Sequence, residues 1–172
     1  MQVEGDYVGA VSKQYVKAIY PNSTGGGSSG GNSSGGGTTT DSISKLTSDE
    51  LEVFNLINQQ RTKNGLSALK INLELQNVAR IKAQDMVNNN YFSHNSPTYG
   101  SPFQMLNSFK VSYKTAGENI AGNSSNQAAV TAWMNSSGHK ANILSSNYNY
   151  TGIGVVSGSK YGKIYVQMFI GK

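Results

Sequence analysis

The last apolar stretch of the chain, from Lys163 to Ile170, sets the tightest limit on the fold. Its residues alternate with the period of a β-strand, with Ile164, Val166, Met168 and Ile170 on one face and Tyr165 and Phe169 on the other. Both faces are therefore apolar, and each must be covered to keep it out of water. A second strand is predicted at Thr151 to Val156. The pattern predicts a sheet that lies between two layers of helices.

Helix signals precede these strands. Thr47 to Glu50 has the pattern of a capping box, and the helix that follows is predicted to stop at Asn64 and Gly65. Asn72 is predicted to cap a second helix, and Pro102 fits the first turn of a third. A fourth helix is predicted after an Asn126 cap, and a short helical turn over residues 139–144.

Composition divides the chain into three parts. Residues 24–44 are rich in Gly, Ser and Thr and are predicted to form a flexible linker. Residues 45–172 form the main predicted domain, and residues 1–23 a short hairpin-like piece that is too small to be stable alone. The run at 9–17 resembles the last strand of bacterial SH3-like wall-binding repeats.

Several classes of protein are excluded by composition. The chain has no cysteine, so disulfides, thiolate metal sites and cysteine nucleophiles are ruled out. No apolar run approaches the roughly 20 residues that cross a bilayer, so no transmembrane segment is predicted. The first 17 residues carry acids and no apolar core, which is not the pattern of a signal peptide.

The charge is unevenly distributed. The net charge is +5, and after Asp85 the only carboxylate side chain belongs to Glu118. Six lysines share that stretch: Lys110, Lys114, Lys140, Lys160, Lys163 and Lys172. Such a surface attracts anionic polymers weakly, and the alternative is a solvated, slightly basic face. No Arg-rich helix is present, so no nucleic-acid partner is predicted.

The candidate chemistry lies in three residues of the main domain. His94 follows a predicted helix end, His139 precedes a short helix, and Glu118 lies in a turn that begins with Gly117. A partly buried carboxylate needs hydrogen-bond donors, and the two imidazoles can supply them. The alternative is that the three residues are unrelated, because their spacing matches no short metal-binding motif.

Four segments together resemble the signature segments of the bacterial CAP superfamily, the SCP/PR-1-like domains common in secreted proteins of Gram-positive bacteria. They are YFSHNSP at 91–97, GENIA at 117–121, AWMNSSGHKANIL at 132–144 and GIGV at 152–155. The resemblance implies an α+β fold, a three-layer α–β–α sandwich with a central, mostly antiparallel sheet and a large central cleft. In many members this cleft holds two histidines and two acids, which in some bind a divalent cation such as zinc.

Matched position by position, His94 and His139 correspond to the two cleft histidines and Glu118 to the acid of the GEN segment. Ser136 stands where the second acid is expected, so the resemblance implies a weaker metal site than a full tetrad. We expect His94 and His139 to be the metal ligands, with zinc the favoured ion. Glu118 is as well suited to orienting the rings as to binding metal.

Three functions remain open at this level. The first is a secreted, cell-wall-associated and monomeric binding module without catalytic activity, whose cleft takes a cell-wall polymer, a lipid or a protein. The second is an extracellular hydrolase with Ser136 as nucleophile, His139 as base and Glu118 or His94 as the orienting group, or with a metal-activated water. Ser136 lies in a segment typical of a helix cap, and no Gly-x-Ser-x-Gly elbow is present. The third is a structural domain with a vestigial cleft.

Overall fold

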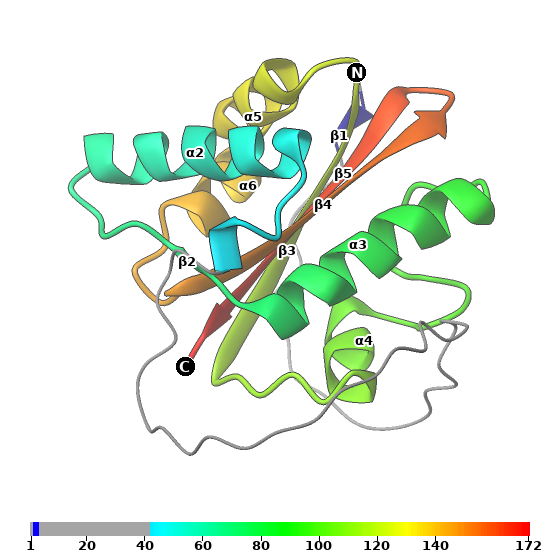
Figure 1. Ribbon diagram of the computed structural model, residues 1–172, viewed down its shortest axis with the longest axis horizontal. Helices are drawn as coiled ribbons and strands as arrows, with labels where there is room; N and C mark the ends of the chain where they lie inside the picture. The colour runs from blue at the N-terminus through cyan, green and yellow to red at the C-terminus, as the bar shows by residue number, and fades with distance from the viewer. Residues whose placement is uncertain (1, 4–41) are drawn as a thin grey trace, which may run out of the picture.

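The computed structural model describes residues 2–3 and 42–172. Its centre is a five-stranded sheet with the order β1-β3-β5-β4-β2. The strands are β1 (Gln2–Val3), β2 (Lys70–Ile71), β3 (Thr115–Asn123), β4 (Tyr150–Ser159) and β5 (Gly162–Gly171). Strand β2 pairs with β4 in parallel, and the other pairs are antiparallel (Figure 1).

Helices cover both faces of this sheet. On one side lie α2 (Ser48–Lys63), α5 (Asn126–Asn135) and α6 (Ser137–Ile143), and on the other lie α3 (Leu73–Asn88) and α4 (Pro102–Ser108) (Figure 1). The predicted three-layer α–β–α sandwich with a mostly antiparallel sheet is therefore confirmed.

The two faces of β5 belong to two separate cores. Ile164, Val166, Met168 and Ile170 pack in the core that α3 and α4 cover. Tyr165 and Phe169 pack in the second core, under α2, α5 and α6. The alternation read from the sequence is thus confirmed, and it fixes the register of the sheet because a one-residue slip would exchange the two faces.

Most of the predicted helix boundaries agree with the structure. The hydroxyl of Thr47 accepts from the backbone N–H of Glu50, and the Glu50 carboxylate accepts from the N–H of Thr47, which completes the capping box. Asn72 caps α3. The predicted Asn126 cap is wrong by one residue, because Ser125 caps α5.

Asn126 is drawn into a different set of contacts. Its side-chain amide donates to the carboxylates of Asp49 and Glu52 at 2.9 and 2.7 Å, and its carbonyl accepts from the hydroxyl of Tyr165 at 3.0 Å. These partners lie on α2 and β5, so a tertiary network uses the side chain that local sequence rules assigned to capping.

The predicted turn at Glu118 is also wrong. Residues 115–123 form the nine-residue strand β3, in which Glu118 lies opposite Met168 of β5. The segment has few residues of high β propensity, and its pairing with β5 decides the conformation. A Cβ atom at Gly117 would lie 2.7 Å from the hydroxyl oxygen of Tyr148, so glycine makes room for that buried ring.

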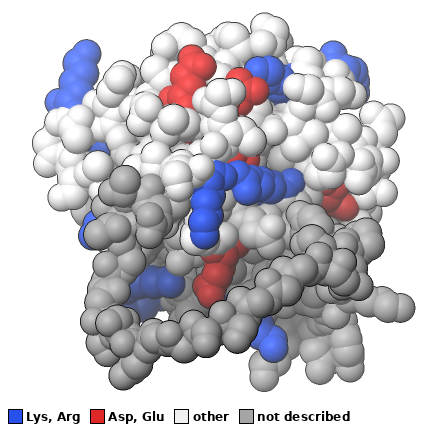
Figure 2. Space-filling model, viewed as in Figure 1, with Lys and Arg blue, Asp and Glu red and all other residues white. Residues whose placement is uncertain are grey.

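The predicted N-terminal piece and linker lie outside the described residues, apart from residues 2–3 and 42–44. Ile43 and Leu46 pack against the second core. Within the described part of the chain, no helix is long and apolar enough to cross a membrane. Charged side chains of both signs are scattered over the face shown in Figure 2.

Candidate functional site

A buried hydrogen bond joins two of the predicted site residues. Nδ1 of His94 lies 2.7 Å from Oε1 of Glu118. The Glu118 side chain is fully buried and that of His94 nearly so. An ionised carboxylate can only accept, so Nδ1 carries the proton and donates it. A ligand would therefore contact the His94 ring at its other nitrogen, Nε2.

The loop that carries His94 is anchored by helix α3. Nζ of the fully buried Lys82 donates to the backbone carbonyl of His94 at 2.6 Å and lies 5.2 Å from the centre of the Tyr91 ring. This ammonium therefore holds the backbone of the site residue and is stabilised by the neighbouring aromatic face.

Asp85, three residues after Lys82 in α3, contacts the same loop. Its carboxylate accepts from four side chains, those of Asn89, Tyr91, Ser96 and Thr98. The pKa of the Tyr91 phenol is raised because the ring is buried and because its hydroxyl donates to this carboxylate. One buried acid thus holds four side chains of the segment 89–98.

Lys82 and Asp85 were not predicted as site residues from the sequence. A signal was available, because both are charged and interrupt the buried face of α3, which apart from Gln76 is otherwise apolar. Charged residues at buried positions of a helix must find partners, and here the partners are in the next loop.

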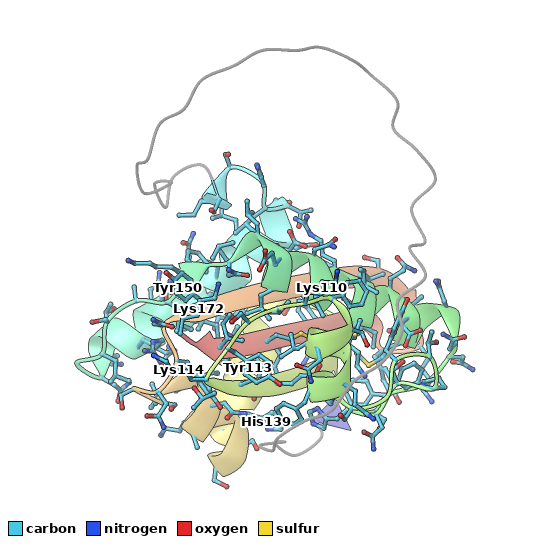
Figure 3. All side chains as sticks on the ribbon, turned by 90° about the horizontal axis from the view of Figure 1, so that it is seen from below. Lys110, Tyr113, Lys114, His139, Tyr150 and Lys172 are labelled. Atoms are coloured by element: carbon cyan, nitrogen blue, oxygen red, sulfur yellow. The ribbon has the colours of Figure 1, made fainter. Side chains whose placement is uncertain are left out.

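His139 is tied to β3 by a chain of amide contacts. The Asn119 side chain donates to the backbone carbonyl of His139 at 3.1 Å, and Asn142 donates to the Asn119 side chain at 3.0 Å. Asn119 directly follows Glu118 in the strand. These bonds place helix α6, with the buried His139 (labelled in Figure 3), beside the same stretch of β3 that presents Glu118.

Ser136 contacts the second histidine. Its Oγ lies 2.7 Å from Nδ1 of His139. Ser136 occupies the N-cap position of α6, as its sequence context indicates, but its side chain makes no capping hydrogen bond. The Ser136 hydroxyl instead forms a hydrogen bond with the imidazole of His139. As in His94, Nδ1 is engaged and Nε2 is the nitrogen that would meet a ligand.

The donor set fits a metal ion only in part. Two imidazoles, each held at Nδ1, resemble the arrangement in which a second partner orients a metal-binding histidine. Glu118 uses one oxygen to hold His94, and Ser136 offers a hydroxyl in place of a second carboxylate. Among the described residues, no three His, Cys, Asp or Glu side chains gather in a way that could hold an ion.

A pocket lies next to the site rather than at it. Its walls come from the end of α3, the following loop and the β4–β5 hairpin, and include Tyr91, Phe92 and Tyr161. None of His94, Glu118, Ser136 and His139 lines it. The central cleft that the family resemblance implies therefore stays a prediction.

Comparison with known proteins identifies the family. The sequence profile described as "CAP: Cysteine-rich secretory protein family" matches residues 54–169. The chain belongs to the CAP family. It is 51% identical over 134 residues to YkwD of Bacillus subtilis (strain 168), an uncharacterized protein, and the match covers 77% of this chain and 51% of YkwD.

Solved structures show the same CAP fold. An extracellular protein containing an SCP domain from Bacillus anthracis superposes with a TM-score of 0.69 at 36% identity, covering 81% of this chain and 45% of that one. An outer surface protein from Borrelia burgdorferi has a TM-score of 0.67 at 23% identity, covering 72% and 92% of the two chains, and shows the fold alone. The chain spans about half the length of YkwD and of the Bacillus anthracis protein.

Proposed function

We propose that this CAP domain is an extracellular binding module without catalytic activity, and that His94, Glu118 and His139 form its ligand site. The observation that carries the proposal is the buried contact between Glu118 and His94. A carboxylate that is fully buried and holds an imidazole in one orientation costs free energy on folding. Such a cost is consistent with a site kept for binding.

The extracellular setting is supported by one relative. The Bacillus anthracis structure, 36% identical to this chain, is that of an extracellular protein. The low content of charged residues, 13%, agrees with a secreted protein of the bacterial cell envelope. The ligand classes that this setting offers are a cell-wall polymer, a lipid or another protein.

A divalent cation, with zinc favoured, is the second part of the proposal. Nε2 of His94 and Nε2 of His139 would hold the ion, and Glu118 would orient the first ring from outside the coordination shell. When bound, the ion would supply a positive centre that attracts an anionic group of the ligand. Because only two protein nitrogens are assigned to the ion, we expect weaker binding than at a site with a full tetrad.

One observation favours a hydrolase as the second candidate. The 2.7 Å contact between Ser136 Oγ and His139 Nδ1 has the geometry of a nucleophile next to its base. Glu118, the acid suggested for such a triad, holds His94 at 2.7 Å. This division of the two histidines between two partners is why binding is preferred over catalysis.

Calorimetric titration with Zn²⁺ tests the cation. We expect one site in the wild type, and its loss in His94→Ala and in His139→Ala, while the neighbouring exposed Lys140→Gln keeps it. Circular dichroism of each variant establishes that it is folded. Absence of heat in the folded wild type, or unchanged binding in both histidine variants, would overturn the assignment.

Turnover of casein and of peptidoglycan fragments tests the absence of catalysis. We expect no turnover by the wild type, with or without added Zn²⁺. Turnover that disappears in Ser136→Ala and His139→Ala would replace the binding module with the hydrolase. The two measurements are independent, so the cation assignment and the non-catalytic assignment can fail separately.

A further inference from the structure

A row of lysines lies along one end of the sheet. Lys114 immediately precedes β3, Lys172 immediately follows β5, and Lys70 lies in β2. The backbone N–H of Lys114 donates to the carbonyl of Gly171, and Lys70 lies opposite Tyr150 in the register of β2 and β4. Since the strand order is β3-β5-β4-β2, these residues follow one another across the strand ends.

The spacing of this row follows from sheet geometry. Neighbouring strands lie about 4.8 Å apart, so the backbones of Lys114 and Lys70, three strands apart, are separated by about 14 Å. Lys110, in the loop between α4 and β3, is not part of this row. In Figure 3 Lys114 and Lys172 lie with Tyr150 on one side of the view, where the strands end, while Lys110 lies apart from them near α4.

Acidic groups do not neutralise the row. All three lysines are exposed, and among the described residues none of them forms an ion pair with a carboxylate. By contrast, Lys163 pairs with Asp49 and Arg80 with Glu50. The nearest acid along the chain is Glu74, in the first turn of α3 near Lys70.

We propose that this lysine row, Lys70, Lys114 and Lys172, binds an extended anionic polymer with phosphate groups in its backbone. Ammonium groups spread along a line match repeated charges on a chain better than they match one compact anion. The lysine ammonium is a point charge and lacks the planar, bidentate hydrogen-bonding geometry of the arginine guanidinium. Lysines are therefore suited to contacts with many similar phosphates rather than to selective recognition of one. The binding should therefore be dominated by counterion release and depend steeply on salt.

Two other anionic partners fit the surface less well. A membrane would need apolar side chains to insert, and Leu73 is the only large hydrophobic residue exposed among the described residues. Single-stranded nucleic acid would need open aromatic faces for base stacking. Nζ of Lys172 lies 5.5 Å from the centre of the Tyr150 ring and occupies that face, and Tyr113 is half-buried.

Binding of sodium polyphosphate to the full chain, measured by calorimetry at low and physiological salt, tests the proposal. The test variant is the triple substitution Lys70→Gln, Lys114→Gln and Lys172→Gln. The matched control, Lys45→Gln with Lys63→Gln and Lys160→Gln, removes the same net charge from other exposed positions. Thermal unfolding of both triples establishes that they fold.

We expect the test triple to bind polyphosphate about tenfold or more weakly, with a salt slope smaller by about one per lysine removed, and the control to stay within about twofold of the wild type. Orthophosphate at equal total phosphate should not compete. Equal losses in the two triples would overturn the proposal, because net charge alone would then explain binding. Failure of the wild type to bind polyphosphate would also overturn it.

The alternative partners are separate arms of the same experiment. Vesicles containing phosphatidylglycerol and single-stranded DNA are each titrated at the same phosphate concentration as polyphosphate. Tighter binding of either one would overturn the assignment to a polymer without lipid or bases. The lysine row and the histidine site are tested with different ligands, polyphosphate here and Zn²⁺ above, so the two proposals can fail separately.

Discussion

Nζ of Lys82, buried inside the domain, donates a hydrogen bond to the backbone carbonyl of His94 at 2.6 Å. The contact joins helix α3 to the loop that carries the first site histidine, 12 residues farther along the chain. The position of the imidazole against Glu118 thus depends on an ammonium group that belongs to a different element of the fold.

Substitution of Lys82 tests this support. Lys82→Met keeps the length of the side chain and removes the donor, which leaves the His94 carbonyl buried without that bond. We expect a loss of about 1–3 kcal/mol in the free energy of unfolding, measured by urea denaturation. Lys63→Met, on the exposed end of α2, should change stability by less than about 0.5 kcal/mol. Equal stability of Lys82→Met and wild type would show that the ammonium does not support the loop.

The role assigned to Glu118 gives a prediction that concerns affinity. Glu118→Gln retains the shape and the acceptor oxygen but loses the charge that favours the oriented ring. If Glu118 acts from outside the coordination shell, Zn²⁺ affinity should fall by about 10- to 100-fold without being abolished. The exposed Glu74→Gln is the control and should leave the titration unchanged. Unchanged affinity in Glu118→Gln would remove this residue from the site.

Glycine at position 154 allows α3 to lie directly against β4. A Cβ atom at Gly154 would overlap the backbone carbonyl of Ala79, and backbone cannot swing aside as a flexible side chain can. We expect Gly154→Ala to lower the free energy of unfolding by about 1–3 kcal/mol, seen as a lower Tm. Ser157→Ala, at an exposed position of the same strand, should have little effect. A Tm for Gly154→Ala that matches the wild type would contradict the close contact.

The buried phenol of Tyr165 gives a prediction for alkaline pH. Burial raises the pKa of Tyr165 from 10.0 to about 12, and the nearby carboxylates of Asp49 and Glu52 act in the same direction. The neutral phenol is therefore favoured in the folded state. Its contribution to stability is complete below pH 10 and is lost as the pH rises from 10 to about 12.

Comparison of wild type with Tyr165→Phe isolates this effect from other groups that titrate at high pH. The variant should be less stable at neutral pH by about 1–2 kcal/mol, because the carbonyl of Asn126 loses its donor. That difference should shrink steadily above pH 10 in urea unfolding experiments. A difference that stays constant up to about pH 12 would show that the phenol titrates alike in both states.

The sequence by itself determined the parts of this protein that depend on local chemistry. The Thr47 capping box, the Asn72 cap and the two faces of the last strand were all predicted correctly, because each signal acts within a few residues. The candidate residues His94, Glu118 and His139 were also identified from the sequence, through their chemistry and the family resemblance.

Only the tertiary structure decided how those residues are used. The pairing of β3 with β5 turned the Glu118 segment into a strand against its weak local preference. Packing places Glu118 in contact with His94, and Ser136 in contact with His139. The strand order brings Lys114, Lys172 and Lys70 to one end of the sheet. These contacts join residues that are distant along the chain, and local propensities carry no information about which partner a buried polar group will meet.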